Sequence, residues 1–296
     1  MNNKKDPGFG RGLFFGFGSY LIWGSFPLII TKLTFASAWE VVSWRIVFGF
    51  LVAALLTTLT RSWPAIIGVL KDKNLMKWMA LATVFIASNW ITYVIGVATH
   101  QTIQTALGYF INPLITILFA VVFLGERLRT PQWIALAIGL VAVGVLTFDY
   151  GRPPWIALVL AVSFAIYSLA KNKVGGKIQA TQSFALESLL VIPIALAQLA
   201  FVASSEHITL LDSPTNAFVL IGFGIMTAVP LILFGAAASR IPLSTIGFIQ
   251  YMTPILQFLT AFFILREPMP TVRWIGFGLV WLSLVVLTFD AIRNKR

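Results

Sequence analysis

The chain has 296 residues, of which 58% are hydrophobic and 10% charged, and its mean hydropathy is +0.90. Soluble globular proteins have about 25% charged residues, so this composition indicates an integral membrane protein and excludes a sizeable soluble domain. The net charge of +11 does not require nucleic acid, because basic residues gather in the cytoplasmic loops of membrane proteins, and the absence of cysteine excludes disulfides and cysteine-ligated metals.

Ten apolar runs are long enough to cross a bilayer as helices, which predicts an all-α integral membrane protein with ten transmembrane helices. The runs cover residues 13–31, 38–59, 76–97, 103–124, 131–148, 153–170, 181–203, 216–238, 243–265 and 271–289. With a cytoplasmic N-terminus, sixteen basic residues fall in inner segments and four in outer ones, so both termini are expected to be cytoplasmic. The first run has no small-residue cleavage pattern and is expected to stay as an anchor in a multi-pass protein of the cytoplasmic membrane.

The first three spans contain candidate lining residues. Pro27 removes a backbone hydrogen bond and frees the carbonyl of Trp23, which indicates a kink at a close helix contact or a polar lining. Arg45 lies about 10 Å along the second span, where a charge is costly and usually faces the bundle interior. It could bind an anionic substrate group, pair with a carboxylate or extend outward. The third span adds Asn89, Trp90 and Tyr93.

The fourth span has a polar stripe that a lipid-facing helix would not keep. The stripe consists of Thr105, Tyr109, Asn112 and Thr116, at steps of four, three and four, so its members share one helix face. Pro113 lies inside the span and frees the carbonyl of Tyr109. A similar stripe returns in the ninth span, where Gln250, Thr253 and Gln257 surround Pro254. Two such stripes suggest a polar path through the membrane.

The sixth and seventh spans contain ionisable side chains. Ser163, Tyr167 and Lys171 lie on one face of the sixth span, and Lys171 is expected to extend towards the inner surface. Glu187 lies inside the seventh span, where a carboxylate is costly unless it is protonated or paired. It is therefore a candidate for proton coupling, with a structural hydrogen bond to a neighbouring helix as the alternative.

An internal repeat relates the two halves of the chain. After a shift of 141 residues, 13 of the 38 positions from 112 to 149 are identical, and Pro113 falls on Pro254 and Glu126 on Glu267. Five spans in each half would make the halves cross the membrane in opposite directions, as inverted repeats over residues 10–149 and 153–290. Such repeats recur in transporters, where two half-domains open to either side of a midplane site.

Several short strings together resemble one membrane protein family. They are Glu40 with Arg45, Asn89-Trp90, Leu107 to Leu114, Glu126-Arg127, Phe164-Ala165 with Tyr167, Glu187 with Pro193, Thr227 with Pro230-Leu231, and Gln250-Tyr251 with Pro254. With these residues the chain resembles the RarD-type permeases of the EamA family, in the drug/metabolite transporter (DMT) superfamily. The resemblance implies two inverted five-helix halves (5+5), a central cavity, and export or exchange of small metabolites or drugs.

The chain departs from this family pattern at the outer ends of the third and fourth spans. Gln104 stands where a glutamate is common, Ala106 where a serine is common, and residues 95–98 differ from the usual string. A carboxylate role at position 104 is therefore lost.

These features favour a secondary transporter that moves a small molecule by alternating access, with no cofactor and no metal. The expected substrate-binding residues are Tyr109, Asn112, Thr116, Gln250, Thr253, Gln257, Asn89, Trp90, Tyr93, Tyr167, Trp23 and Arg45, with Glu187 as the residue that exchanges a coupling proton. The expected partners are the substrate, lipid and a proton, without nucleic acid; a monomer suffices and a dimer is not excluded. The alternative is a channel or a membrane-embedded receptor. An intramembrane enzyme is disfavoured, because the two histidines fall in loops and no metal-ligand spacing is present.

Overall fold

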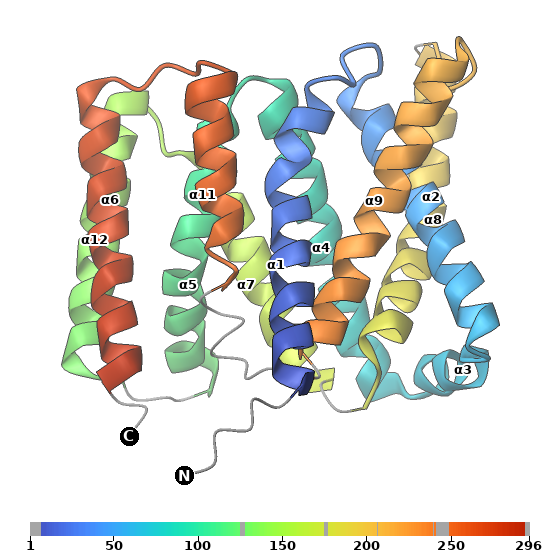
Figure 1. Ribbon diagram of the computed structural model, residues 1–296, viewed down its shortest axis with the longest axis horizontal. Helices are drawn as coiled ribbons and strands as arrows, with labels where there is room; N and C mark the ends of the chain where they lie inside the picture. The colour runs from blue at the N-terminus through green and yellow to red at the C-terminus, as the bar shows by residue number, and fades with distance from the viewer. Residues whose placement is uncertain are drawn as a thin grey trace.

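The computed structural model describes residues 7–124, 128–174, 177–205, 207–238, 240 and 249–293. The helices run α1 Pro7–Ile30, α2 Ala38–Leu59, α3 Trp63–Lys71, α4 Lys73–Ala98, α5 Thr102–Leu124, α6 Thr130–Tyr150, α7 Trp155–Val174, α8 Ala180–Ser205, α9 Pro214–Ala238, α11 Met252–Leu259, the π-helical turn η1 Thr260–Ile264, and α12 Thr271–Arg293. The long helices stand upright beside one another, and α1 begins at the end of the bundle where α12 finishes (Figure 1).

This arrangement is that of a multi-pass membrane protein. In the part of the chain that the structure describes, eight helices are long and apolar enough to cross a bilayer. The expected sixth and ninth spans appear as shorter apolar helices, over Trp155–Lys171 and Met252–Ile264. Residues 243–248, which begin the expected ninth span, and Glu126 lie outside the described residues.

Two local features differ from the sequence-based expectation. Residues 60–75, between the second and third apolar runs, were expected as an inner loop but contain the short helix α3, which lies across one end of the bundle (Figure 1) and buries Ile66 and Val69. Pro254 lies in the first turn of α11, where a missing N–H costs no helical hydrogen bond, whereas Pro113 lies well inside α5. The two matching prolines therefore act differently on their helices.

The two halves of the chain interlock. The main helix contacts pair α6 with α12, α5 and α4 with α7, α2 with α8, and α1 with α9 and α11. Every one of these pairs joins a helix of residues 10–149 to a helix of residues 153–290. The 141-residue shift also relates these pairs to one another. The contact of α5 with α7 corresponds to the contact of α11 with α1, and the contact of α4 with α7 corresponds to that of α9 with α1.

Glycine allows α5 to approach α7 very closely. A Cβ at Gly108 would lie 2.8 Å from the carbonyl oxygen of Ala157 and 2.9 Å from the Cβ of Leu160. Small residues let the backbones of membrane helices approach in this way. The apolar core on this side continues through Leu107, Phe110 and Ile111, so the string that supports the family resemblance is a helix-packing sequence.

Candidate functional site

The polar face of α5 and α4 contacts the backbone of α7. Asn112 donates from Nδ2 to the carbonyl oxygen of Ala161 at 3.0 Å. Asn89 donates from Nδ2 to the carbonyl oxygen of Leu160 at 3.0 Å and to Oγ of Ser163 at 3.0 Å, and its Oδ1 accepts from the Tyr109 hydroxyl at 3.1 Å. Both asparagines are buried, so their amides hold α7 in place. The partly buried hydroxyl of Tyr109 extends this network through its hydrogen bond to Asn89.

The polar face of α11 contacts the backbone of α1 in the corresponding way. Thr253 donates from Oγ1 to the carbonyl oxygen of Tyr20 at 3.0 Å. Gln257 donates from Nε2 to the carbonyl oxygen of Trp23 at 3.5 Å, the carbonyl that Pro27 leaves free within α1. The Oε1 atom of Gln257 is buried without a hydrogen-bond partner among the described residues.

These contacts match across the 141-residue shift. Asn112 contacts residue 161, and Thr253 contacts residue 20. The two donors, 112 and 253, differ by 141 positions, and so do the two acceptors, 20 and 161. Likewise, Asn89 contacts Leu160, and the counterpart contact runs from Oγ of Ser19 to the carbonyl oxygen of Pro230 at 2.9 Å. Different side chains thus close the same contact in the two halves, which supports a two-fold relation between them.

Arg45 lies in an aromatic enclosure between four helices. Its side chain is 4% exposed, and its Nε donates to Oγ1 of Thr227 at 2.9 Å. The rings around its Cζ, given by the distance to each centroid, are Trp90 at 4.9 Å, Phe26 at 5.5 Å and Phe223 at 5.5 Å. Arg45 therefore does not extend outward, and it forms none of the ion pairs found among the described residues.

Two hydrogen-bond donors near Arg45 have no partner among the described residues. One is Nη1 of Arg45 itself and the other is the hydroxyl of Tyr93, which is 3% exposed. Tyr93 lies one turn from Trp90 on α4, and the centroid of its ring lies 5.9 Å from that of Tyr109. Buried donors are normally satisfied, so an unpaired set marks a place where a ligand or water can bind.

Glu187 lies apart from Arg45, in a polar cluster between α7 and α8. Its carboxylate is 2.7 Å from Nζ of Lys171, accepts from Oγ of Ser183 at 3.2 Å, and accepts from the Tyr167 hydroxyl at 3.4 Å. Lys171 also donates to Ser183. Lys171 thus turns inward rather than extending to the membrane surface, and Tyr167 belongs to this cluster rather than to the surroundings of Arg45.

The remaining expected lining residues are more scattered. Thr116 is exposed on α5, Gln250 is half-buried just before α11, and Trp23 packs on Tyr20 and Phe234, at 5.3 and 6.1 Å between ring centroids. The structure therefore brings Arg45, Trp90, Tyr93, Asn89 and Tyr109 together, and leaves Thr116 outside the group.

Sequence reasoning missed the partners that come from other helices. Phe223 and Thr227 are one turn apart on α9 and both contact Arg45, so a helical face was the available signal. Glu267 accepts from the backbone N–H groups of Thr102 at 2.7 Å and Ile103 at 2.8 Å, and so caps the start of α5. Only the shape of the fold brings residue 267 to residue 102.

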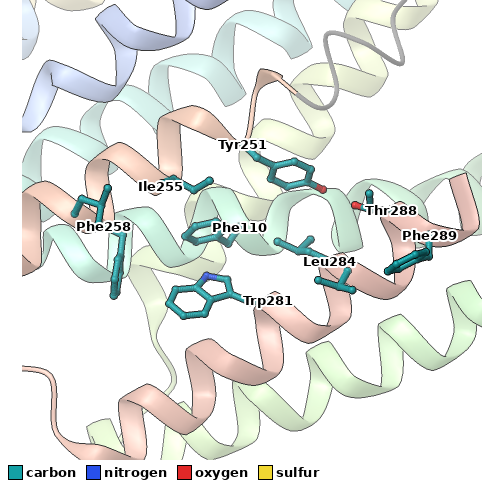
Figure 2. Close-up of a pocket in the computed structure, with 10 residues that line it drawn as sticks. Phe110, Tyr251, Ile255, Phe258, Trp281, Leu284, Thr288 and Phe289 are labelled. Carbon is teal, nitrogen blue, oxygen red and sulfur yellow. The ribbon is translucent and has the colours of Figure 1, made fainter. Parts of the chain in front are cut away.

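Arg45 does not line either of two cavities in the structure. The larger, of about 490 Å³, is an apolar groove between α5, α11 and α12 (Figure 2), where Phe110, Phe258 and Trp281 face it. The smaller, of about 200 Å³, lies at the ends of α1, α2 and α4, lined by Val41, Val94 and His100 among others. The apolar groove offers no charge to a substrate. The smaller cavity lies closer to the candidate site, because its lining residue Val41 is one turn from Arg45 and Val94 is next to Tyr93. Across the described residues, no three His, Asp or Glu side chains come together to hold a metal ion.

Comparison with known proteins gives consistent matches over the whole chain. The model of the EamA-like transporter family matches residues 10–148 and again residues 153–289. Protein RarD of Streptomyces exfoliatus is 42% identical over 96% of this chain and 90% of its own length, and protein RarD of Escherichia coli K12 is 33% identical over 97% and 96%. An uncharacterized transporter of Vibrio cholerae is 33% identical over 96% and 93%. A crystal structure with 18% identity superposes with a TM-score of 0.61 over 97% of this chain and 99% of that one, which shows a shared fold.

Proposed function

This chain belongs to the EamA-like transporter family, among the RarD-type permeases, and on that premise we propose that it is a secondary transporter of a small organic molecule. The proposed direction, export or exchange, follows from the family resemblance, and the basic loops favour an orientation in the cytoplasmic membrane with both termini cytoplasmic. A monomer contains both halves and is sufficient for this activity; assembly as a dimer stays open.

The observation that supports alternating access is the matched set of contacts between the halves. Asn112 to Ala161 and Thr253 to Tyr20 are the same contact made twice, with the roles of the halves exchanged. Inverted repeats over residues 10–149 and 153–290 can adopt two mirrored arrangements, each opening a central site to one side. The side-chain-to-carbonyl contacts would keep their geometry while the helix bundles rock around the site.

The proposed substrate site surrounds Arg45 and Tyr93, with Trp90 and Tyr109 as its walls and Asn89 behind Tyr109. Thr253 and Gln257 would close it from α11. Glu187 is the proposed coupling group, because protonation would remove the charge that attracts Lys171 and so loosen α7 from α8. A channel or a receptor remains the competing function, and accumulation of substrate against its gradient separates it from a coupled transporter.

The test is transport by the purified protein in liposomes with an imposed pH gradient. A panel of small metabolites and drugs is screened for accumulation while a pH-sensitive dye follows the protons. The parent should accumulate at least one compound, and Glu187→Gln should reduce its uptake to the level without a gradient. Asp212→Asn, at an exposed loop carboxylate, is the matched control and should transport like the parent.

Two outcomes contradict parts of the proposal. Gradient-driven uptake that is unchanged in Glu187→Gln rejects Glu187 as the coupling group and leaves its ion pair a structural feature. Passage of compounds that only equilibrate, never accumulate, and move no protons favours a channel.

A further inference from the structure

We propose that Arg45 and Tyr93 bind a carboxylate group of the transported molecule, so that the substrates are organic acids with an apolar body. This inference rests on the proposed function, because it names the substrate class of the same site. It starts from two unpaired donors, Nη1 of Arg45 and the hydroxyl of Tyr93. Both are buried, and they belong to the contacting helices α2 and α4.

The donors fit a carboxylate in number and in charge. The Arg45 guanidinium is held at Nε by Thr227, at 2.9 Å, which fixes the plane of its fork and leaves Nη1 to donate. A guanidinium recognises carboxylates through such planar donors, and a phenol can donate to the same oxygen pair. Burial raises the strength of these bonds, because water does not compete for the donors.

No carboxylate of the described chain neutralises Arg45. Glu187 pairs with Lys171, and Glu40 accepts from Thr209 and Trp44. The others have partners elsewhere, since Asp149 and Asp290 bind Arg273 and Arg129, Asp212 binds His207, Asp72 caps α4, and Glu267 caps α5. A buried charge without a counter-charge is costly, and an anionic substrate would supply one.

The repeat provides an internal control for this assignment. The positions that correspond to Arg45, Tyr93 and Thr227 after the 141-residue shift are Leu186, Phe234 and Ile86. The equivalent places in the fold are thus filled by apolar side chains, so helix packing alone does not require a guanidinium, a phenol or a hydroxyl. The polar set, which Arg45 and Tyr93 of the first half form with Thr227 of the second, therefore occurs once and is not repeated by the shift, as expected for a site that binds one asymmetric ligand.

The surroundings define the rest of the ligand. Phe26, Trp90 and Phe223 place three aromatic rings within 5.5 Å of the guanidinium carbon, which suits an apolar or aromatic body. One guanidinium balances one negative charge, so a phosphate dianion would remain uncompensated in this enclosure. The carboxylate can belong to a simple acid or to a zwitterionic amino acid, and the unpaired Oε1 of Gln257 on α11 is a buried acceptor of the kind that an ammonium group needs.

The test measures ligand-induced thermal stabilisation of the purified protein, which requires binding but not transport. The ligands share one apolar body: phenylacetate, its neutral amide phenylacetamide, phenylalanine and phenyl phosphate, with octanoate as a non-aromatic acid. The parent should bind the carboxylic acids, and should bind neither the amide nor phenyl phosphate. Arg45→Gln should weaken acid binding at least about tenfold, as expected for a charged hydrogen bond, and Tyr93→Phe should weaken it by a smaller factor.

The controls keep the outcome interpretable. Arg152→Gln makes the same side-chain change at an exposed position and should leave binding unchanged. Tyr93→Phe removes a single oxygen and installs the residue found at position 234, so it reports on the site even if Arg45→Gln does not fold. Binding of phenylalanine alone, lost in Arg45→Gln, assigns the carboxylate to an amino acid.

The inference is overturned if no acid stabilises the parent, if the amide binds as well as the acid, or if both variants bind acids like the parent. If acid binding depends on Arg45 but the protein transports none of these compounds, the proposed function is contradicted and the carboxylate site is retained.

Discussion

Lys171 and Glu187 occupy positions whose counterparts, 141 residues earlier, are Ile30 and Ile46. Both isoleucines belong to one buried apolar cluster, whereas the lysine and the glutamate form an ion pair at 2.7 Å. Removing two charges from water costs about as much as their attraction returns, so a buried ion pair is a weak source of stability. A need to join α7 to α8 therefore does not explain the charges at 171 and 187, which agrees with the coupling role that we propose for Glu187.

A pair of substitutions tests this at the residue scale. Lys171→Ile leaves Glu187 buried without its counter-charge and should destabilise the protein by about 3 kcal/mol. Lys171→Ile combined with Glu187→Ile copies the apolar pair of the first half and should regain stability to within about 1 kcal/mol of the parent. Thermal unfolding in detergent measures both, and a double variant as unstable as the single one would show that the charges are structural.

At the scale of helices, the close approach of α5 to α7 depends on Gly108. The approach brings α7 near enough for Asn112 and Asn89 to reach the carbonyl oxygens of Ala161 and Leu160. Wider separation would leave two buried amides without partners, and buried polar groups without hydrogen bonds are expensive. One glycine thus supports both the packing and the polar contacts of the candidate site.

Two glycine substitutions separate packing from helix propensity. Gly108→Ala places a methyl group 2.8 Å from a carbonyl oxygen, so α7 must shift, and we expect a loss of about 1–3 kcal/mol. Gly144→Ala in α6 meets nothing within 4 Å and should be neutral or stabilising by up to about 1 kcal/mol, because alanine favours helix. Unfolding midpoints in detergent report both; equal effects of the two changes would contradict the close contact.

Helix positions could be predicted from sequence because an apolar run of spanning length is a local signal. The runs 38–59 and 103–124 became α2 and α5 with almost the same limits. The partners of polar side chains could not be predicted, since a periodic stripe shows that residues share a face and not what lies opposite. Asn112 meets a backbone carbonyl of α7, while Thr116, one turn later on that stripe, is exposed.

The surroundings of Arg45 show the same limit at the site itself. Its depth in the second span marked it as a candidate, but Phe26, Trp90 and Phe223 come from three other helices. The partner of Glu187 was equally hidden: Lys171 was expected to extend to the surface, and the fold instead turns it towards α8. The sequence thus located the charges of Arg45 and Glu187 inside the membrane, but their neighbours depend on how the helices pack.

At the scale of the whole molecule, the two halves are joined at both ends of α6 and α12. Arg129 binds Asp290 at 2.6 Å, and Arg273 binds Asp149 at 2.7 Å. The two aspartates differ by 141 positions. Asp149 lies near the end of α6 and binds the start of α12, and Asp290 lies near the end of α12 and binds the start of α6. These antiparallel helices stand as a pair at one edge of the bundle (Figure 1).

Inverted topology predicts that matched positions lie on opposite sides of the membrane. Lys71 and Asp212 differ by 141 positions, and both are exposed, Lys71 at the end of α3 and Asp212 in the turn before α9. Because the chain has no cysteine, single Lys71→Cys and Asp212→Cys variants can be labelled in intact cells with an impermeant maleimide. Asp212→Cys should react from outside, and Lys71→Cys only after permeabilisation; labelling of both from one side would rule out the inverted repeat.

The interlocking of the halves has a consequence for biosynthesis. While the ribosome has delivered only the first 149 residues, Asn89 and Asn112 lie in the bilayer without Leu160 and Ala161 to accept their amides, and Arg45 lacks Thr227. Insertion of α7 satisfies both asparagines at once, and α9 then reaches the arginine. The nascent first half must therefore remain loosely assembled, shielded by lipid, the translocon or an insertase, until the later helices arrive to complete it.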